Sequence, residues 1–178
     1  MEATTVVKPR TEEEVRRVIE EIDLDPIKVK LMDTKEGLSW TRDCADEVER
    51  LYRHFLFLSW KYSDRPITPS WDIDDFWHFH ILDTMKYVED CNRIFGHYLH
   101  HFPYFGMRDE EDAAKLTAAA EETRRLFYEE CGVDPSQTPA LVGGRKCGKY
   151  CGSVVPGINP GGLDILQVQR RPTLPPRR

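Results

Sequence analysis

Residues 70–96 read SWDIDDFWHFHILDTMKYVEDCNRIFG, and this stretch decides how the chain folds. Ser70 and Asp72 are both favoured helix N-cap residues, and Gly96 is the residue type that most readily ends a helix in a left-handed conformation. We therefore predict one long helix that begins at Ser70 or Asp72 and ends near Phe95.

The segments on either side also carry helical signals. Thr11 and Glu14 form a capping box ahead of an apolar stripe, and Asp25-Pro26 favours a short helix, although residues 27–31 also alternate like a strand. Residues 96–108 are an aromatic-rich irregular link. The predicted helices are 11–22, a short one after Asp25, about 39–62, 70–95 and 109–131. We expect an all-α fold, a compact bundle of four to five helices.

Residues 136–178 differ in composition from the rest of the chain. Glycine and proline recur throughout this segment, so we expect an irregular, flexible tail. Residues 145–178 hold seven Lys or Arg and one acid, a net charge of +6, so with a total of −6 the remainder carries −12. We therefore divide the chain into a helical domain, 1–135, with a central His-rich segment, and a Gly/Pro-rich basic tail, 136–178.

Several classes of function are disfavoured by composition. An acidic body argues against nucleic acid as a ligand, because neutralising phosphates needs a basic face. No apolar run approaches the ~20 residues that span a bilayer, and residues 1–10 lack the apolar core of a signal peptide. Five cysteines, an odd number, do not indicate a disulfide framework. These features predict a cytoplasmic protein with reduced thiols that binds neither nucleic acid nor membrane.

Five of the six histidines lie in one central segment. On a helix, residues four apart share a face, so Asp74 and His78 would be neighbours. We predict that they form one wall of a metal site completed from the following loop by His97, His100 or His101. His97 and His101, four residues apart, are the loop ligands that we choose. Two imidazoles and a carboxylate bind divalent iron, zinc or manganese and leave coordination positions open.

His80 would point almost opposite to His78, because residues two apart do not share a helix face. His80 shares a face with Tyr87, and we predict that this pair acts in catalysis, either by supporting the metal ligands or as proton carriers. For His80 alone, the favoured interpretation is a hydrogen-bonded core histidine without a chemical role. In that interpretation Asp74 would only fix the ring of His78.

Two motifs stand out in the tail. Cys147 and Cys151 are four apart in a basic, glycine-rich setting, which favours reactive thiols; they could form a redox or metal-capturing pair, supply thiolate ligands to the histidine cluster, or be inert. Residues 172–177 read PTLPPR and fit the Pro-x-x-Pro-x-Arg pattern that polyproline-binding domains accept.

Residues 40–106 resemble the glycine-rich domain-containing protein-like family. The resemblance rests on Ile73-Asp74, then Trp77-His78-x-His80, Tyr87, Asp90-Cys91 and Phe95-Gly96. It implies a compact helical module in which these His and Cys positions serve a shared purpose, and it implies no particular reaction. Glycine-rich regions occur in plant members of that family, whereas this chain has only scattered glycines after residue 143.

Three functional hypotheses follow from the sequence. The first is a metal-binding helical protein, acting as a metal-dependent enzyme on a small molecule or a peptide through the His/Asp cluster. The second is a non-catalytic interaction module whose Pro/Arg-rich tail recruits a protein partner. The third is a thiol redox protein that uses Cys147 and Cys151.

Overall fold

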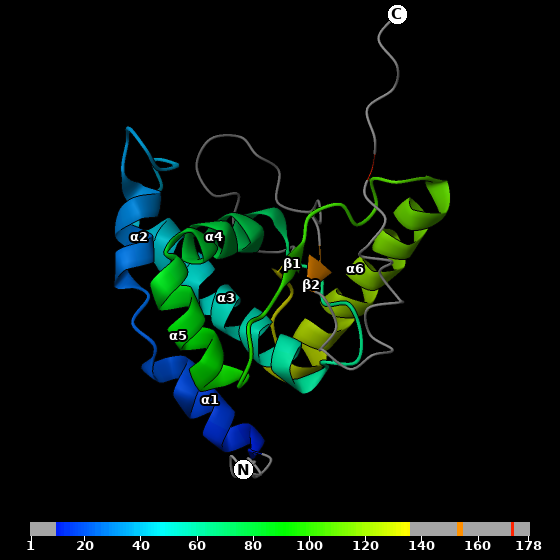
Figure 1. Ribbon diagram of the computed structural model, residues 1–178, viewed down its shortest axis with the longest axis horizontal. Coiled ribbons are helices and arrows are strands. Elements are labelled where there is room, and N and C mark those ends of the chain that lie inside the picture. Colours follow the sequence, from blue (N-terminus) through cyan, green and yellow to red (C-terminus); the bar gives the residue numbers. More distant parts are fainter. Residues whose placement is uncertain (1–9, 136–152, 155–171, 173–178) are drawn as a thin grey trace, which may run out of the picture.

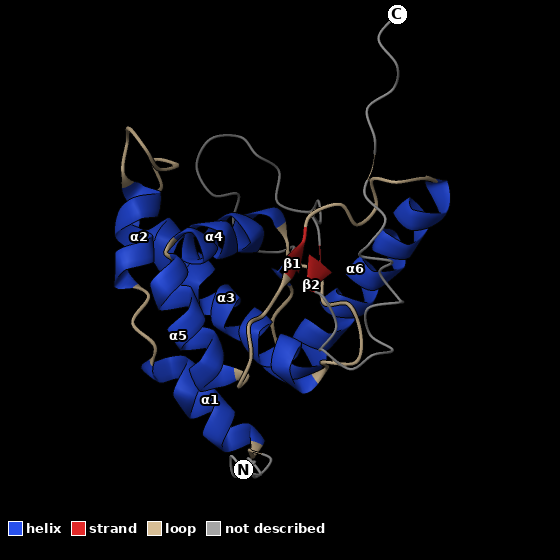
Figure 2. Cartoon of the chain, in the orientation of Figure 1, coloured by secondary structure: helices blue, strands red, loops and turns tan. Residues whose placement is uncertain are grey.

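The computed structural model describes residues 10–135, 153–154 and 172, and within them the protein is almost entirely helical (Figures 1 and 2). This confirms the predicted all-α class. The described elements are the helices α1 (Glu12–Glu21), α2 (Asp25–Met32), α3 (Arg42–Lys61), α4 (Trp71–Leu82), α5 (Thr84–Ile94) and α6 (Glu110–Cys131), with the short strands β1 (His101–Phe102) and β2 (Ser153–Val154).

Helix α3 is the centre of the bundle. It contacts α1, α2, α4 and α6, and Figure 1 shows it running through the middle of the molecule. Its C-terminal half is apolar on nearly all sides, and residues 55–58 are all buried. A helix buried on several faces needs this composition, because each face must pack against a different neighbour. None of the described helices is both long and apolar enough to cross a bilayer.

The predicted helix ends are confirmed where capping residues are strong. Thr11 and Glu14 form the reciprocal capping box of α1, and Thr41 accepts a hydrogen bond from a main-chain N–H in the first turn of α3. At α6, Asp109 caps the start, and Gly132 ends the helix in a left-handed conformation with φ of 66°. Each of these residues satisfies main-chain groups left unpaired at a helix end, so it acts locally.

The prediction of one helix across 70–95 is wrong, because the chain breaks at Asp83 into α4 and α5. The two halves fold against each other, which brings Tyr87 to Trp77 and Asp90 to His80. Residues ten apart on a continuous helix would be separated by about 15 Å along its axis. The break is therefore what allows the two buried hydrogen bonds to form.

The link after α5 is partly ordered by strand pairing. Strand β1 pairs antiparallel with β2, with His101 opposite Val154, and Figure 2 shows the two strands side by side. Apart from residue 172, the rest of the predicted flexible tail lies outside the described residues. The division at residue 135 stays a prediction.

Candidate metal centre

Asp74, His78 and His101 form the group of potential metal ligands that the structure brings together within the described residues. One ligand atom from each side chain lies within 4.8 Å of the other two. The two imidazole Nε2 atoms are 2.7 Å apart. Asp74 Oδ1 is 3.2 Å from His101 Nε2, and Asp74 Oδ2 is 3.6 Å from His78 Nε2. The chain therefore holds a His/His/Asp triad that could bind a metal ion.

Two elements supply this triad. Asp74 and His78 are one helical turn apart on α4, as their spacing predicts. His101 comes from β1, where the chain returns to α4 after α5. The side chains of Asp74 and His101 are buried, whereas that of His78 is 44% exposed. His78 is therefore the member of the triad that is most accessible to solvent.

Two buried polar atoms of the triad, and one on the residue that precedes α4, have no hydrogen-bond partner. Within the described residues, the buried side-chain atoms without such a partner are Ser70 Oγ, Asp74 Oδ1 and His101 Nδ1. The 3.2 Å distance between Asp74 Oδ1 and His101 Nε2 is short enough for a hydrogen bond, but the angle at the donor is too far from linear for one to form. Because native proteins pair nearly all buried polar atoms, this concentration indicates that a further polar group belongs here.

The ring of His101 packs against the indole ring of Trp77. The two rings stack with centroids 4.4 Å apart and planes 18° apart. The indole Nε1 of Trp77 donates a 2.8 Å hydrogen bond to the Tyr87 hydroxyl, which donates a 2.6 Å hydrogen bond to the Leu99 carbonyl. Leu99 lies two residues before His101. Burial raises the pKa of Tyr87 far above its ordinary value, so its hydroxyl stays protonated and remains a donor.

His80 belongs to a separate buried network on the other side of α4. Its Nδ1 is 2.9 Å from the Tyr52 hydroxyl, and its Nε2 is 3.1 Å from Asp90 Oδ2. Lys86 also binds Asp90, at 2.9 Å. Burial acts to raise the pKa of Asp90, but hydrogen bonds from His80 and Lys86 outweigh it and hold that pKa below its usual value. The network joins α3, α4 and α5.

The structure thus separates the residues that we singled out from the sequence. His101 joins Asp74 and His78, whereas the predicted ligand His97 lies outside this group. His80 and Tyr87 are buried, with 1% and 0% exposure, and neither belongs to the triad; their predicted catalytic role stays a prediction. The pair Cys147 and Cys151 lies outside the described residues, as does most of the predicted polyproline motif. Ser70 was not identified as a site residue, although it precedes Asp74 by one helical turn.

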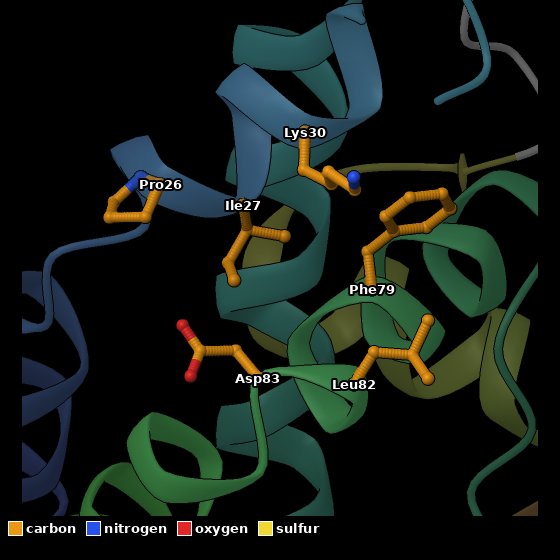
Figure 3. A pocket seen from close by; sticks show the side chains of 6 residues that line it. All are labelled: Pro26, Ile27, Lys30, Phe79, Leu82 and Asp83. Carbon is orange, nitrogen blue, oxygen red and sulfur yellow. The ribbon is translucent and has the colours of Figure 1, made fainter. Parts of the chain in front are cut away.

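A pocket of about 420 Å³ lies elsewhere on the described surface. It opens between α2 and the end of α4, and Figure 3 shows the side chains around it. The residues that line it are Pro26, Ile27, Lys30, Phe79, Leu82 and Asp83. None of these is a triad residue, so the pocket does not form part of the triad.

The donor set restricts the chemistry that the triad can support. Two neutral imidazoles and one carboxylate suit zinc, iron or manganese, and they fill only three coordination positions. Ligand atoms around such ions are about 3–3.4 Å apart, given metal–ligand bonds of about 2.0–2.2 Å. The nitrogens of His78 and His101, at 2.7 Å, would therefore separate by roughly half an ångström when an ion enters.

A family comparison identifies the chain. The model of the UCP032817-like family matches residues 14–140, which is most of the chain, so the protein belongs to that family. The resemblance to the glycine-rich domain-containing protein-like family is therefore wrong: the Trp-His-x-His segment lies within the UCP032817-like match. No curated protein and no solved structure matches this chain.

Proposed function

We propose that this member of the UCP032817-like family is a metalloprotein that binds one divalent ion between Asp74, His78 and His101. The observation that carries the proposal is Asp74 Oδ1, a buried carboxylate oxygen with no hydrogen-bond donor. A buried carboxylate is costly unless a cation or donors compensate it. An ion between the three side chains would bind this oxygen and both facing imidazole nitrogens at once.

The competing arrangement is a metal-free hydrogen-bond cluster. In it, one imidazole donates Nε2–H to the other across the 2.7 Å contact, and Asp74 holds the rings in place. This arrangement leaves Asp74 Oδ1 without an aligned donor, because the 3.2 Å approach of His101 is misaligned. An ion removes that deficit, and for this reason we favour metal binding.

The open coordination positions support a metal-dependent reaction on a small molecule or a peptide. A zinc, iron or manganese ion held by three protein ligands can bind water and polarise a substrate oxygen. The half-exposed ring of His78 provides the approach from solvent. Two separate predictions remain for the tail: residues 172–177 recruit a protein partner, and Cys147 and Cys151 carry out thiol chemistry.

Elemental analysis of untagged protein tests the proposal directly. We expect about one zinc, iron or manganese ion per chain, and we expect His78→Ala to lower affinity by more than the roughly 10–100-fold typical of losing an indirect partner. His100→Ala is the matched control, because His100 is exposed and lies just before His101 but outside the triad. Metal-free protein that also fails to take up zinc, iron or manganese in titration would refute the proposal.

A further inference from the structure

Ser70 is a buried hydroxyl that the helix it begins does not use. It is the N-cap residue of α4, yet its side chain makes no capping hydrogen bond. The residue is 4% exposed, and its Oγ has no hydrogen-bond partner. A serine N-cap normally accepts a hydrogen bond from a main-chain N–H in the first turn. The position of Ser70 therefore requires another explanation.

The other unpartnered atoms indicate where that explanation lies. Within the described residues, the remaining buried side-chain atoms without a partner belong to Asp74 and His101, both members of the triad. Asp74 and His78 lie one turn apart on α4, and Ser70, the N-cap residue of the same helix, precedes Asp74 by four residues. The unsatisfied hydroxyl is thus at the start of the helix that carries two of the three metal ligands.

From this arrangement we infer that Ser70 binds the oxygen ligand that occupies an open coordination position of the metal. This inference rests on the proposed metal site. The ligand is water in the resting protein and a substrate oxygen during turnover. Ser70 itself does not bind the ion; it positions the ligand by a hydrogen bond.

The distances that this arrangement needs match a single helical turn. Side chains four apart on a helix have Cβ atoms about 5–6 Å apart. A metal–oxygen bond of about 2.1 Å followed by a hydrogen bond of about 2.8 Å spans nearly the same length. One metal-bound water therefore has a reach of about one helical turn, and Ser70 precedes Asp74 by one such turn in the sequence.

The chemistry of the Ser70 side chain suits a neutral oxygen ligand. A hydroxyl can donate and accept a hydrogen bond but carries no charge. Water, an alcohol or a carbonyl oxygen can therefore exchange a hydrogen bond with it.

Ser70→Ala tests the inference, with Ser59→Ala as the matched control. Ser59 is also a buried serine, 3% exposed, but its Oγ donates a 2.8 Å hydrogen bond to the Phe55 carbonyl. Two quantities are measured: zinc affinity by competition with a chelator, and the visible spectrum of the cobalt-loaded protein, which reports the ligands around the ion. Urea unfolding of the metal-free protein gives stability separately.

We expect Ser70→Ala to weaken zinc binding by about 10–100-fold and to change the cobalt spectrum, with no decrease in the urea midpoint of the metal-free protein. Ser59→Ala should lower the urea midpoint and leave zinc affinity and the spectrum unchanged. Ser70→Thr, which retains the hydroxyl, should restore the affinity.

The opposite pattern overturns the inference. If Ser70→Ala lowers the urea midpoint but leaves affinity and spectrum unchanged, Ser70 is only a structural helix cap. If the unsubstituted chain binds neither zinc nor cobalt, the proposed function fails together with this inference. Normal binding by the unsubstituted chain and an unaltered Ser70→Ala variant would refute the inference alone.

Discussion

The hydroxyl of Tyr87 links the buried core to the loop that carries His101, and its removal is a sensitive test of the structure. The hydroxyl accepts a hydrogen bond from Trp77 Nε1 and donates one to the Leu99 carbonyl. Phenylalanine would retain the ring but remove both interactions. All three residues are at most 3% exposed, so water cannot readily replace the lost partner.

The expected loss of unfolding free energy in Tyr87→Phe follows from the two buried groups that lose their hydrogen-bond partner. A buried donor or acceptor without a partner costs about 1–3 kcal/mol. Tyr87→Phe leaves the Trp77 N–H and the Leu99 C=O in this state, so we expect a loss of about 3 kcal/mol, allowing for some relaxation. For a chain of this length, that loss lowers the melting temperature by about 6–12 °C.

Chemical and thermal unfolding of the metal-free protein measure this cost, and Tyr98→Phe is the control. Tyr98 is half-buried and packs edge-on against the Tyr87 ring, with centroids 5.0 Å apart. Its hydroxyl should contribute less than about 0.5 kcal/mol. In a proton–nitrogen correlation spectrum, the indole resonance of Trp77 should shift in Tyr87→Phe only. A loss below about 1 kcal/mol with an unshifted indole resonance would refute the hydrogen-bond chain.

Two further predictions concern the supporting structure. Burial acts to raise the pKa of Asp90, but hydrogen bonds from His80 and Lys86 have the larger opposite effect, so the pKa is lowered in the folded protein. The stabilisation that the Asp90 carboxylate provides is therefore complete above the unfolded pKa of about 3.9. It is lost as the pH falls through the lower pKa of the folded state. The difference in unfolding free energy between the unsubstituted chain and Asp90→Asn should therefore be largest near neutral pH and shrink below about pH 4, and a pH-independent difference would contradict this account. Gly106→Ala should lower the free energy of unfolding by about 2–3 kcal/mol, measured by urea denaturation, because φ at Gly106 is +85° and the added methyl group would overlap the Leu116 side chain. An unchanged free energy of unfolding would show that this turn relaxes freely.

The helix ends were predictable because their causes are local. Thr11 with Glu14, and Asp109 with Gly132, satisfy main-chain groups within a few residues of themselves. The break at Asp83 was not predictable in this way, because residues 73–95 contain neither proline nor glycine. Its cause is tertiary: the break permits the buried contacts of α5 with α4.

Apolar residues at the break also obscured it. Leu82 is 74% exposed and Met85 is 85% exposed, so hydrophobic character at these two positions does not mark the buried face.

The triad residues show the same division between local and tertiary causes. The pairing of Asp74 with His78 follows from helical spacing, which the sequence displays directly. Whether His101 or His97 joins the triad depends on how the link after α5 returns to α4. His101 lies 23 residues after His78, so no local pattern encodes this contact. The spacing of Ser70 from Asp74 was visible in the sequence, but the missing capping bond that draws attention to it appears only in the structure.

Helix α4 presents its two histidines to different surroundings, and Trp77, on the same helix, contacts residues in both of these surroundings. His78 belongs to the triad and His80 faces the core, because side chains two residues apart on a helix point in nearly opposite directions. Trp77 stacks on His101 with its ring face and donates to Tyr87 through Nε1, so it contacts both the triad and the buried residues behind it. A shift of Tyr87 would therefore move the Trp77 ring that supports His101 without touching His101 itself. On this basis, substitutions in the buried residues should affect metal affinity in proportion to how far they displace Trp77, whereas substitutions around His80 that leave Trp77 in place should affect stability alone.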